Sequence, residues 1–478
     1  MMAGADESVR VRVAAGVLVG AQIVAAGGAV AMNLLAAVVL APSARGDLAF
    51  GLQLVYFLSV FAIMGLERPF IATRFGGFGD EYRRFARLVL PGTVVILPIA
   101  VLATTVAPFS TRWLWAGAIA IGGYVALNSL VHAVRVAYVC SREWKWFALN
   151  AIATQAIIVA GALSLVLLGV DDPVIWMWVY VGSTIPAVLI LLFSPRAGAS
   201  SALSRAGAPS PLTRAGAPSA LTRAGASSPL TRAEARGLRR RGWILLPSEF
   251  SNSAMLHSDR LLLPILSSSA ELGLYVTVAT VLEMATWPVQ QWVDASLRGW
   301  SKAFRSRRFP IARLFAQCVA LLIGIVTVLG AAAYAMIVFV LPDSYLPATV
   351  AIPALAVSAV VFGITRVQQG LFIAADAPGT VSTIEVIGTA AALVAYVVLI
   401  PQLGMLGAAF GSIIGYSLCA IAGAIALRQV RRKRKPIEAD GFEEGDDCTE
   451  ARASGPCANE SEEGIVEAAG RSADRTKD

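Results

Sequence analysis

The stretch Gly242–Tyr275, GWILLPSEFSNSAMLHSDRLLLPILSSSAELGLY, decides how the rest of the chain is interpreted. Its first part, up to about Leu266, is apolar and long enough to cross a bilayer as a helix, which takes roughly 20 residues. The same part carries Glu249, Asn252, Ser253, His257, Asp259 and Arg260. Ionisable groups at membrane depth usually face a water-filled cavity or a partner, so this helix predicts a functional site inside a membrane protein.

The spacing of these polar residues places most of them together. Positions 249, 252, 253, 257 and 260 follow the i, i+3, i+4, i+8, i+11 interval that lines one helix face. An alternative applies to Asp259 and Arg260, which could sit at the outer headgroup level and end the helix.

Composition indicates a membrane protein. Of the 478 residues, 57% are hydrophobic and only 15% are charged, whereas a soluble protein carries about a quarter charged residues. Apolar runs of about 18 residues or more recur, which is typical of transmembrane helices and not of barrel strands. The net charge of +8 comes largely from basic residues in short loops, as the positive-inside rule produces, so we expect no nucleic-acid partner.

The sequence predicts an all-α polytopic membrane protein with about twelve transmembrane helices. Basic and non-basic loops alternate, which places both termini and the central loop in the cytoplasm and the chain in the cytoplasmic (inner) membrane as a multi-pass protein. The predicted spans are residues 13–40, 48–69, 88–108, 113–138, 146–169, 173–193, 243–266, 272–296, 312–341, 349–373, 381–400 and 405–427.

The run from Val13 to about Leu40 is longer than the apolar region of a cleavable signal peptide, so it predicts an uncleaved first helix. The five cysteines show no metal-ligand spacing and none lies in a predicted external loop, so we expect neither a metal site nor a structural disulfide.

A low-complexity segment divides the spans into two groups of six. We expect an N-terminal tail (1–12), an N-lobe (13–193), a cytoplasmic linker (194–241), a C-lobe (242–428) and a cytoplasmic tail (429–478). The linker repeats units such as RAGAPSPLT, with arginines nine residues apart, and its small residues predict disorder. It is either a basic arm for anionic headgroups or a spacer expanded by repetition. The acidic tail is also predicted to be disordered.

The two groups of spans resemble each other. Asn33–Ala49 reads NLLAAVVLAPSARGDLA and Asp259–Tyr275 reads DRLLLPILSSSAELGLY. In both segments an apolar helix end is followed by small residues, a charged residue and a glycine that opens the next helix. Because each half has an even number of spans, the halves would be six-helix lobes related by a parallel pseudo-repeat about an axis along the membrane normal. This symmetry favours a two-lobed transporter with its substrate path between the lobes.

Two segments also carry a family resemblance. VVLAPSARGDLAFGLQLVYFLSVFAIMGLERPFIATR, residues 38–74, and DRLLLPILSSSAELGLYVTVATVLEM, residues 259–284, resemble the starts of the two halves of Wzx-type polysaccharide exporters. These belong to the multidrug/oligosaccharidyl-lipid/polysaccharide (MOP) exporter superfamily. The resemblance implies that undecaprenyl-linked sugar units are flipped across the cytoplasmic membrane without a cofactor. The implied partners are the polyprenyl-linked sugar, the lipid bilayer and enzymes of polysaccharide assembly.

Further polar stripes lie in other predicted spans. Glu283 lies near the middle of its span, so it is either paired with a cation from another helix or protonated during part of a cycle. Arginines near the cytoplasmic ends could merely extend to the interface. The stripes are Tyr124, Asn128, His132 and Arg135; Thr280, Glu283, Trp287, Gln290 and Asp294; Arg366, Gln368 and Gln369; and Glu385.

A lipid-linked sugar carries a diphosphate, which the planar fork of arginine suits. The predicted substrate-binding residues are Arg68, His132, Arg135, Asn252, His257, Arg260, Arg366 and Gln369. The residues predicted to couple an ion or to balance charge are Glu249, Asp259, Glu283 and Glu385. The alternative for any one of them is a structural ion pair between helices.

Three other functions remain open. A cation-coupled drug or metabolite exporter of the same superfamily would share this layout, although the span 13–40 lacks an acid. A membrane enzyme of polysaccharide assembly would need a sizeable external loop, and the two histidines show no triad or metal spacing. A non-transporting scaffold would not need acids and arginines inside its spans.

Overall fold

The computed structural model describes residues 20–21, 24–73, 77–106, 113–141, 143–193, 232–290, 292–293, 296, 300, 311–375 and 377–433. The predicted N-terminal tail, residues 194–231 of the predicted linker and the tail from residue 434 lie outside these ranges. Within them the regular structure is helical and no strand occurs. The contacts reported below lie within Met1–Val430, which forms one unit of the chain.

The first half contains the apolar helix Val24–Val39 and seven labelled helices. These are α2 (Pro42–Ile63), α3 (Glu67–Thr73), α4 (Phe78–Val106), α5 (Trp113–Ser141), α6 (Trp144–Leu167), α7 (Pro173–Gly182) and α8 (Ile185–Phe193). The second half contains α10 (Arg232–Leu266), α11 (Ser269–Glu283), α13 (Ile311–Phe339), the 3-10 helix η1 (Asp343–Ala351), α14 (Ile352–Ala374), α15 (Pro378–Leu403) and α16 (Met405–Lys433).

The predicted spans are confirmed as helical segments. Ten described segments are long and apolar enough to cross a membrane. The shorter helix Val24–Val39 and the polar helix α10 occupy the remaining two predicted spans. Large apolar side chains stay exposed along these helices, for example Leu102 at 64% and Val328 at 69%, which suits contact with lipid chains. The chain therefore has the fold of a multi-pass, all-α membrane protein.

Several predicted boundaries are wrong. The third span was predicted as 88–108, but α4 begins at Phe78. The second span was predicted as 48–69, but α2 begins at Pro42, because proline lacks the N–H that would have no partner at the first helical position. It ends at Ile63, where Met64 and Gly65 take left-handed φ values of 52° and 61°. In addition, α10 begins at Arg232, so residues 232–241 are helical instead of disordered. Leu238 from this extension is buried in a cluster with Phe70 and Phe85 of the first half.

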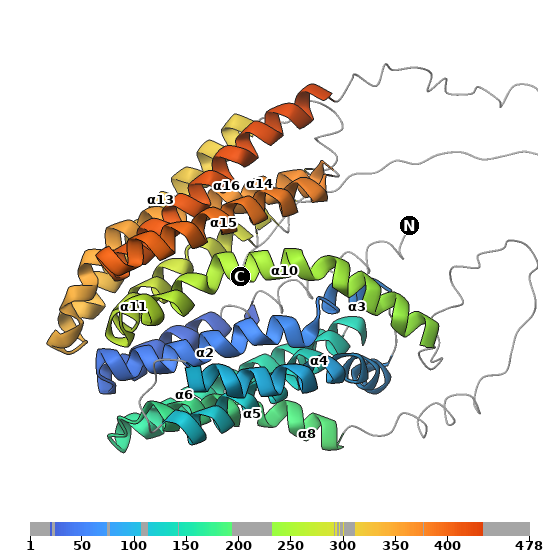
Figure 1. Cartoon of the computed structure of the whole chain (residues 1–478), viewed down its shortest axis with the longest axis horizontal. Helices are drawn as coiled ribbons and strands as arrows, with labels where there is room; N and C mark the ends of the chain where they lie inside the picture. The colour runs from blue at the N-terminus through green and yellow to red at the C-terminus, as the bar shows by residue number, and fades with distance from the viewer. Residues whose placement is uncertain are drawn as a thin grey trace, which may run out of the picture. The chain divides into compact units, whose positions relative to one another are not determined.

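The helices pack in two sets joined by α2. In the first half, α4 packs on α5 and both contact α2; in the second, α10 packs on α15, and α13 on α14. Helix α2 also packs along α10 and α11 of the second half (Figure 1). Phe250 of α10 contacts Phe57 and Phe61 of α2, with ring centroids 5.5 Å and 5.4 Å apart. The two halves therefore meet along α2, α10 and α11.

One crossing between the halves has no room for side chains. A Cβ atom on Gly46 of α2 would collide with the carbonyl oxygen of Ser269, and one on Gly273 of α11 would collide with that of Pro42. Each would also lie 3.1 Å from the backbone nitrogen of the opposite glycine. Ser269 precedes Gly273 by the same interval as Pro42 precedes Gly46, so the contact is reciprocal. This reciprocity agrees with the predicted internal repeat.

Next to this crossing, α11 also holds the start of α16. The Glu271 carboxylate accepts a hydrogen bond from the backbone nitrogen of Met405 at 2.8 Å. Met405 follows Gly404, whose φ of 55° turns the chain sharply between α15 and α16. A carboxylate at a helix N-terminus satisfies an unbonded amide and complements the helix dipole. Glu271 therefore ties α11 to α16 at the end of the bundle where Gly46 and Gly273 meet.

Candidate functional site

A buried charged network joins α10 to α11. Asp259 and Arg260 are 4% and 5% exposed. The Nη2 group of Arg260 donates to Glu283 of α11, and the Tyr275 hydroxyl donates to Asp259 at 2.6 Å. The second Asp259 oxygen accepts from the Arg260 backbone nitrogen at 2.8 Å. The Asp259, Arg260 and Tyr275 side chains are buried inside the bundle, which does not fit the alternative that Asp259 and Arg260 end the helix among lipid headgroups.

The position of each group follows from helix geometry. Side chains lean toward the N-terminus of their helix. Helices α10 and α11 are antiparallel, and Glu283 lies farther than Arg260 from the turn that joins them. The two side chains therefore lean toward each other along the helix axes. Sequence spacing placed each residue on a polar helix face, and it left open whether Glu283 is paired or protonated. In the structure it is paired with Arg260.

A small cavity adjoins this network. Its volume is about 30 Å³, which is room for about two water molecules. Pockets for drug-sized molecules measure about 300–1,000 Å³, so the cavity suits a proton, a water or a small ion in this conformation, and not a sugar. The polar residues that line it are Asp259, Tyr275, Glu283, Thr286, Ser358, Ser412 and Tyr416.

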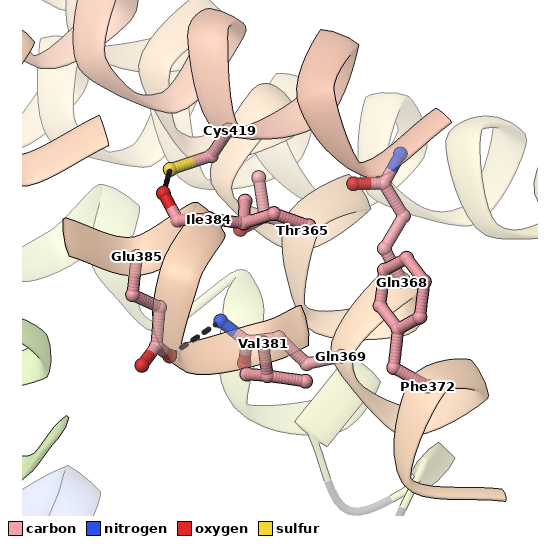
Figure 2. A pocket seen from close by; sticks show the side chains of 8 residues that line it. All are labelled: Thr365, Gln368, Gln369, Phe372, Val381, Ile384, Glu385 and Cys419. Carbon is pink, nitrogen blue, oxygen red and sulfur yellow. Dashed lines mark hydrogen bonds between the residues drawn. The ribbon is translucent and has the colours of Figure 1, made fainter. Parts of the chain in front are cut away.

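A second cluster links α14 to α15. Arg366 donates to the Gln369 side-chain oxygen at 2.9 Å, and the Gln369 amide donates to Glu385 at 2.9 Å. Figure 2 shows the Gln369 amide facing the Glu385 carboxylate beside a cavity of about 10 Å³. The Arg366 guanidinium also lies over the Phe362 ring, 4.5 Å from its centroid. The side-chain amide of Gln369 therefore links Arg366 to Glu385, two of the residues predicted from the sequence.

A third cluster lies in the first half, between α3 and α5. Glu67 contacts His132 Nδ1 at 3.5 Å and Arg135 Nε at 3.8 Å. The Arg135 side chain is 52% exposed, so this contact is weak and open to exchange. Glu67 is not among the residues predicted from the sequence. The turn at Met64 and Gly65 brings it to α5, and no periodic signal marks that turn in advance.

The remaining predicted residues lie on α3 and α10. Glu249 and His257 are half-buried on α10. His257 Nδ1 has no hydrogen-bond partner among the described residues. The side chains of Arg68 and Asn252 lie outside the described part of the structure. Within the described ranges, no group of three or more histidine, cysteine or acidic residues is placed to hold a metal ion.

Tyr275 was also missed by sequence reasoning, and its role is testable. Tyr275→Phe removes one hydrogen bond to the buried Asp259 carboxylate and should lower the free energy of unfolding by about 1.5–3 kcal/mol. Thermal melting of the purified protein in nanodiscs measures the effect. Tyr334→Phe, at a tyrosine that is 54% exposed, is the matched control and should melt like the wild type. Equal melting of both variants would mean that the Asp259 contact contributes no stability.

No family model matches this chain, and no curated protein matches it in sequence. Solved structures do share its fold. An inward-facing multidrug resistance MATE family transporter of the MOP superfamily aligns with a TM-score of 0.59 and 11% identity, over 85% of this chain and 96% of that one. The lipid II flippase MurJ, in an inward closed conformation, aligns at 0.58 with 11% identity, over 85% and 86%.

A third alignment is with a MOP superfamily transporter from Pyrococcus furiosus, at a TM-score of 0.53 and 15% identity, over 89% of this chain and 95% of that one. At these identities the likeness establishes the fold alone. The chain therefore has the fold of the MOP transporters, and its substrate has to be argued from its own residues.

Proposed function

We propose that this protein is a membrane transporter that flips a lipid-linked, diphosphate-bearing oligosaccharide across the cytoplasmic membrane by alternating access. The observation that carries the proposal is the network of buried Asp259, Arg260 and Tyr275 with the half-buried Glu283, next to the contact between the two halves. Charged groups are costly at membrane depth and mark the paths of ions or substrates. The sequence resemblance to Wzx-type exporters and the shared MOP fold support the same reading.

The three clusters share a feature that suits an anionic head group. Each presents one arginine held by an acceptor from the same half, Arg135 by Glu67, Arg260 by Glu283 and Arg366 by Gln369. A diphosphate offers several charged oxygens, with which a guanidinium forms paired hydrogen bonds. Exchange of the resident acceptor for a phosphate oxygen would let the head group move between arginines while the apolar tail stays in lipid.

A second candidate function is a cation-coupled exporter of a small molecule. The observation that favours it is the cavity beside α10 and α11, which is lined by the carboxylates of Asp259 and Glu283 and the hydroxyls of Ser358 and Ser412. Oxygen ligands of this kind suit hard cations. In the first candidate function the same acids balance the charge of Arg260. Both candidates place the termini in the cytoplasm, as the loop charges predict.

Transport in proteoliposomes tests the first function. The measurement is the appearance of a labelled polyprenyl-diphosphate sugar in the far leaflet, at equal amounts of protein. Arg135→Ala, Arg260→Ala and Arg366→Ala each remove a charge-assisted contact of about 1.5–3 kcal/mol, so the rate should fall about 10- to 100-fold. Full activity in all three variants would remove the diphosphate contacts from the mechanism.

Transport assays with the wild-type protein distinguish the two candidate functions. Failure to move the labelled lipid would contradict the flippase proposal. Uptake of Na⁺ or protons into the vesicles, stimulated by a small organic cation but not by the lipid, would favour the second function.

A further inference from the structure

The first turns of α10 have two different faces. On one face Leu238 is 7% exposed and lies in the apolar cluster that contains Phe70 and Phe85 of the first half. Gly242 follows one turn later on the same face, and a Cβ atom on it would lie 2.6 Å from the carbonyl oxygen of Met64. This part of α10 is therefore packed closely on the first half, so its other face points away from the bundle.

The opposite face begins with exposed arginines. Arg236 and Arg240 are one helical turn apart, so their side chains are neighbours, and Arg241 lies beside them. All three side chains are exposed. Within the described residues, no ion pair joins any of them to an acidic side chain. These three residues are called the arginine face below.

One turn further along α10, the same side of the helix becomes apolar. Trp243 and Ile244 follow the arginines and are 60% and 67% exposed. Ile244 is four residues after Arg240, which is about 6 Å along the helix axis. Tryptophan is enriched where headgroups meet acyl chains, and arginine extends its charge toward the headgroups. Because side chains lean toward the N-terminus of their helix, Arg240 extends away from the apolar residues.

Helix α4 changes from charged to apolar at a comparable depth. Arg87 is exposed, and so are large apolar side chains one and two turns after it. Met64 relates the two helices, because a Cβ atom on Gly92 of α4 would lie 3.3 Å from its side chain, and Gly242 of α10 meets its carbonyl oxygen. Arg87 precedes Gly92 by five residues, and Arg236 precedes Gly242 by six. Two helices therefore indicate the same boundary between a charged and an apolar surface.

We propose that the arginine face docks the headgroups of anionic phospholipids of the cytoplasmic leaflet, with Trp243 at the adjoining boundary. Each guanidinium donates hydrogen bonds to lipid phosphate oxygens, and the acyl chains continue along the apolar residues that follow. The inference does not depend on which molecule the protein transports. It assigns the headgroup role to the helical end of the predicted linker.

The acidic tail of the chain offers the same sign of charge, from Glu438 to Glu463. The apolar residues beside the arginine face favour the lipid over the tail. A phospholipid covers both parts of this surface, since its phosphate meets the arginines and its acyl chains meet Trp243 and Ile244. A polar, acidic peptide would neutralise the arginines and leave the apolar part exposed.

Quenching of Trp243 fluorescence by brominated lipids measures which headgroup lies beside the arginine face. The full-length protein is reconstituted into phosphatidylcholine vesicles that contain brominated phosphatidylglycerol or brominated phosphatidylcholine. The signal of Trp243 is the difference between each protein and the same protein with Trp243→Phe. In the wild type, phosphatidylglycerol should quench more strongly, since each arginine near the surface enriches anionic lipid about 5-fold.

Substitutions in the arginine face should reduce this preference. Arg236→Gln and Arg240→Gln should each lower it about 5-fold, and the double variant should lower it further. Arg240→Lys keeps the charge and should retain most of the preference. Lys145→Gln, at an exposed cation of α6, is the matched control and should match the wild type. Equal quenching of the wild type by both lipids, or an undiminished preference in the double variant, would overturn the proposal.

A peptide competition tests the acidic tail as the occupant. A peptide with the sequence of residues 438–463, added in excess to the wild-type vesicles, should leave the quenching by brominated phosphatidylglycerol unchanged. Loss of the preference on addition of the peptide would assign the arginine face to the tail and contradict lipid docking.

Discussion

Gly273→Ala is expected to push α2 and α11 apart and to shift the protein away from the conformation described here. The added methyl group would collide with the Pro42 carbonyl oxygen, and backbone cannot rotate away as a side chain can. Overpacking of this kind costs typically 1–3 kcal/mol, roughly a 5- to 150-fold change in a conformational equilibrium. Spin labels at the exposed positions Ser43 and Ser267 should report a longer distance between the two helices in the variant.

The matched control for this substitution is Gly324→Ala in α13, where a Cβ atom would meet nothing within 4 Å. Alanine favours the helical backbone over glycine, so this variant should be as stable as the wild type or more stable. Gly46→Ala tests the reciprocal side and should behave as Gly273→Ala does. If the label distance and the transport rate stayed at wild-type values in both variants, the crossing would have no part in the conformational cycle.

Glu283→Ala is expected to have the second large effect, on both stability and transport. It removes the ion-pair partner of the Arg260 guanidinium, whose side chain is 6% exposed. Breaking a fully buried pair costs about 3–5 kcal/mol, and the 43% exposure of the Glu283 side chain reduces this to about 1–3 kcal/mol. Thermal melting and lipid transport of the same preparation measure the two effects.

A double-mutant cycle separates the ion pair from general damage. Arg260→Met combined with Glu283→Ala removes both charges and should recover part of the stability lost in Glu283→Ala. Transport should not recover, because the proposed diphosphate ligand is lost. Additive losses of stability, with no recovery in the double variant, would show that the two residues act independently and that the pair is not the source of the effect.

The number and placement of the helices could be predicted because the membrane imposes one rule on every span. Each backbone group must be bonded inside its own helix, and the apolar length must match the bilayer. Charge in the short loops then separates one span from the next. The errors lie where local chemistry overrides hydropathy. Pro42 and Met64 move the ends of α2, the charged start of α4 extends that helix before its apolar run, and the arginine-rich start of α10 is helical because it packs on the first half.

The contacts within the candidate site could be predicted only in part. Asp259, Arg260 and Glu283 were selected as ionisable residues inside predicted spans, and the structure places them in one network. Spacing within one helix carries no information about its neighbour, so the roles of Tyr275 and Glu67 were not visible. The predicted spans 13–40 and 48–69 left out Arg45, which is buried in the first turn of α2 because that helix begins at Pro42.

The glycine crossing has a mechanical consequence. At Gly46 and Gly273 the backbones of α2 and α11 touch directly, without a side chain of one helix packed between side chains of the other. At this one point, separation of α2 and α11 requires no side chain to leave a packed position. The two halves are therefore in direct backbone contact at a place where no side chain hinders their separation.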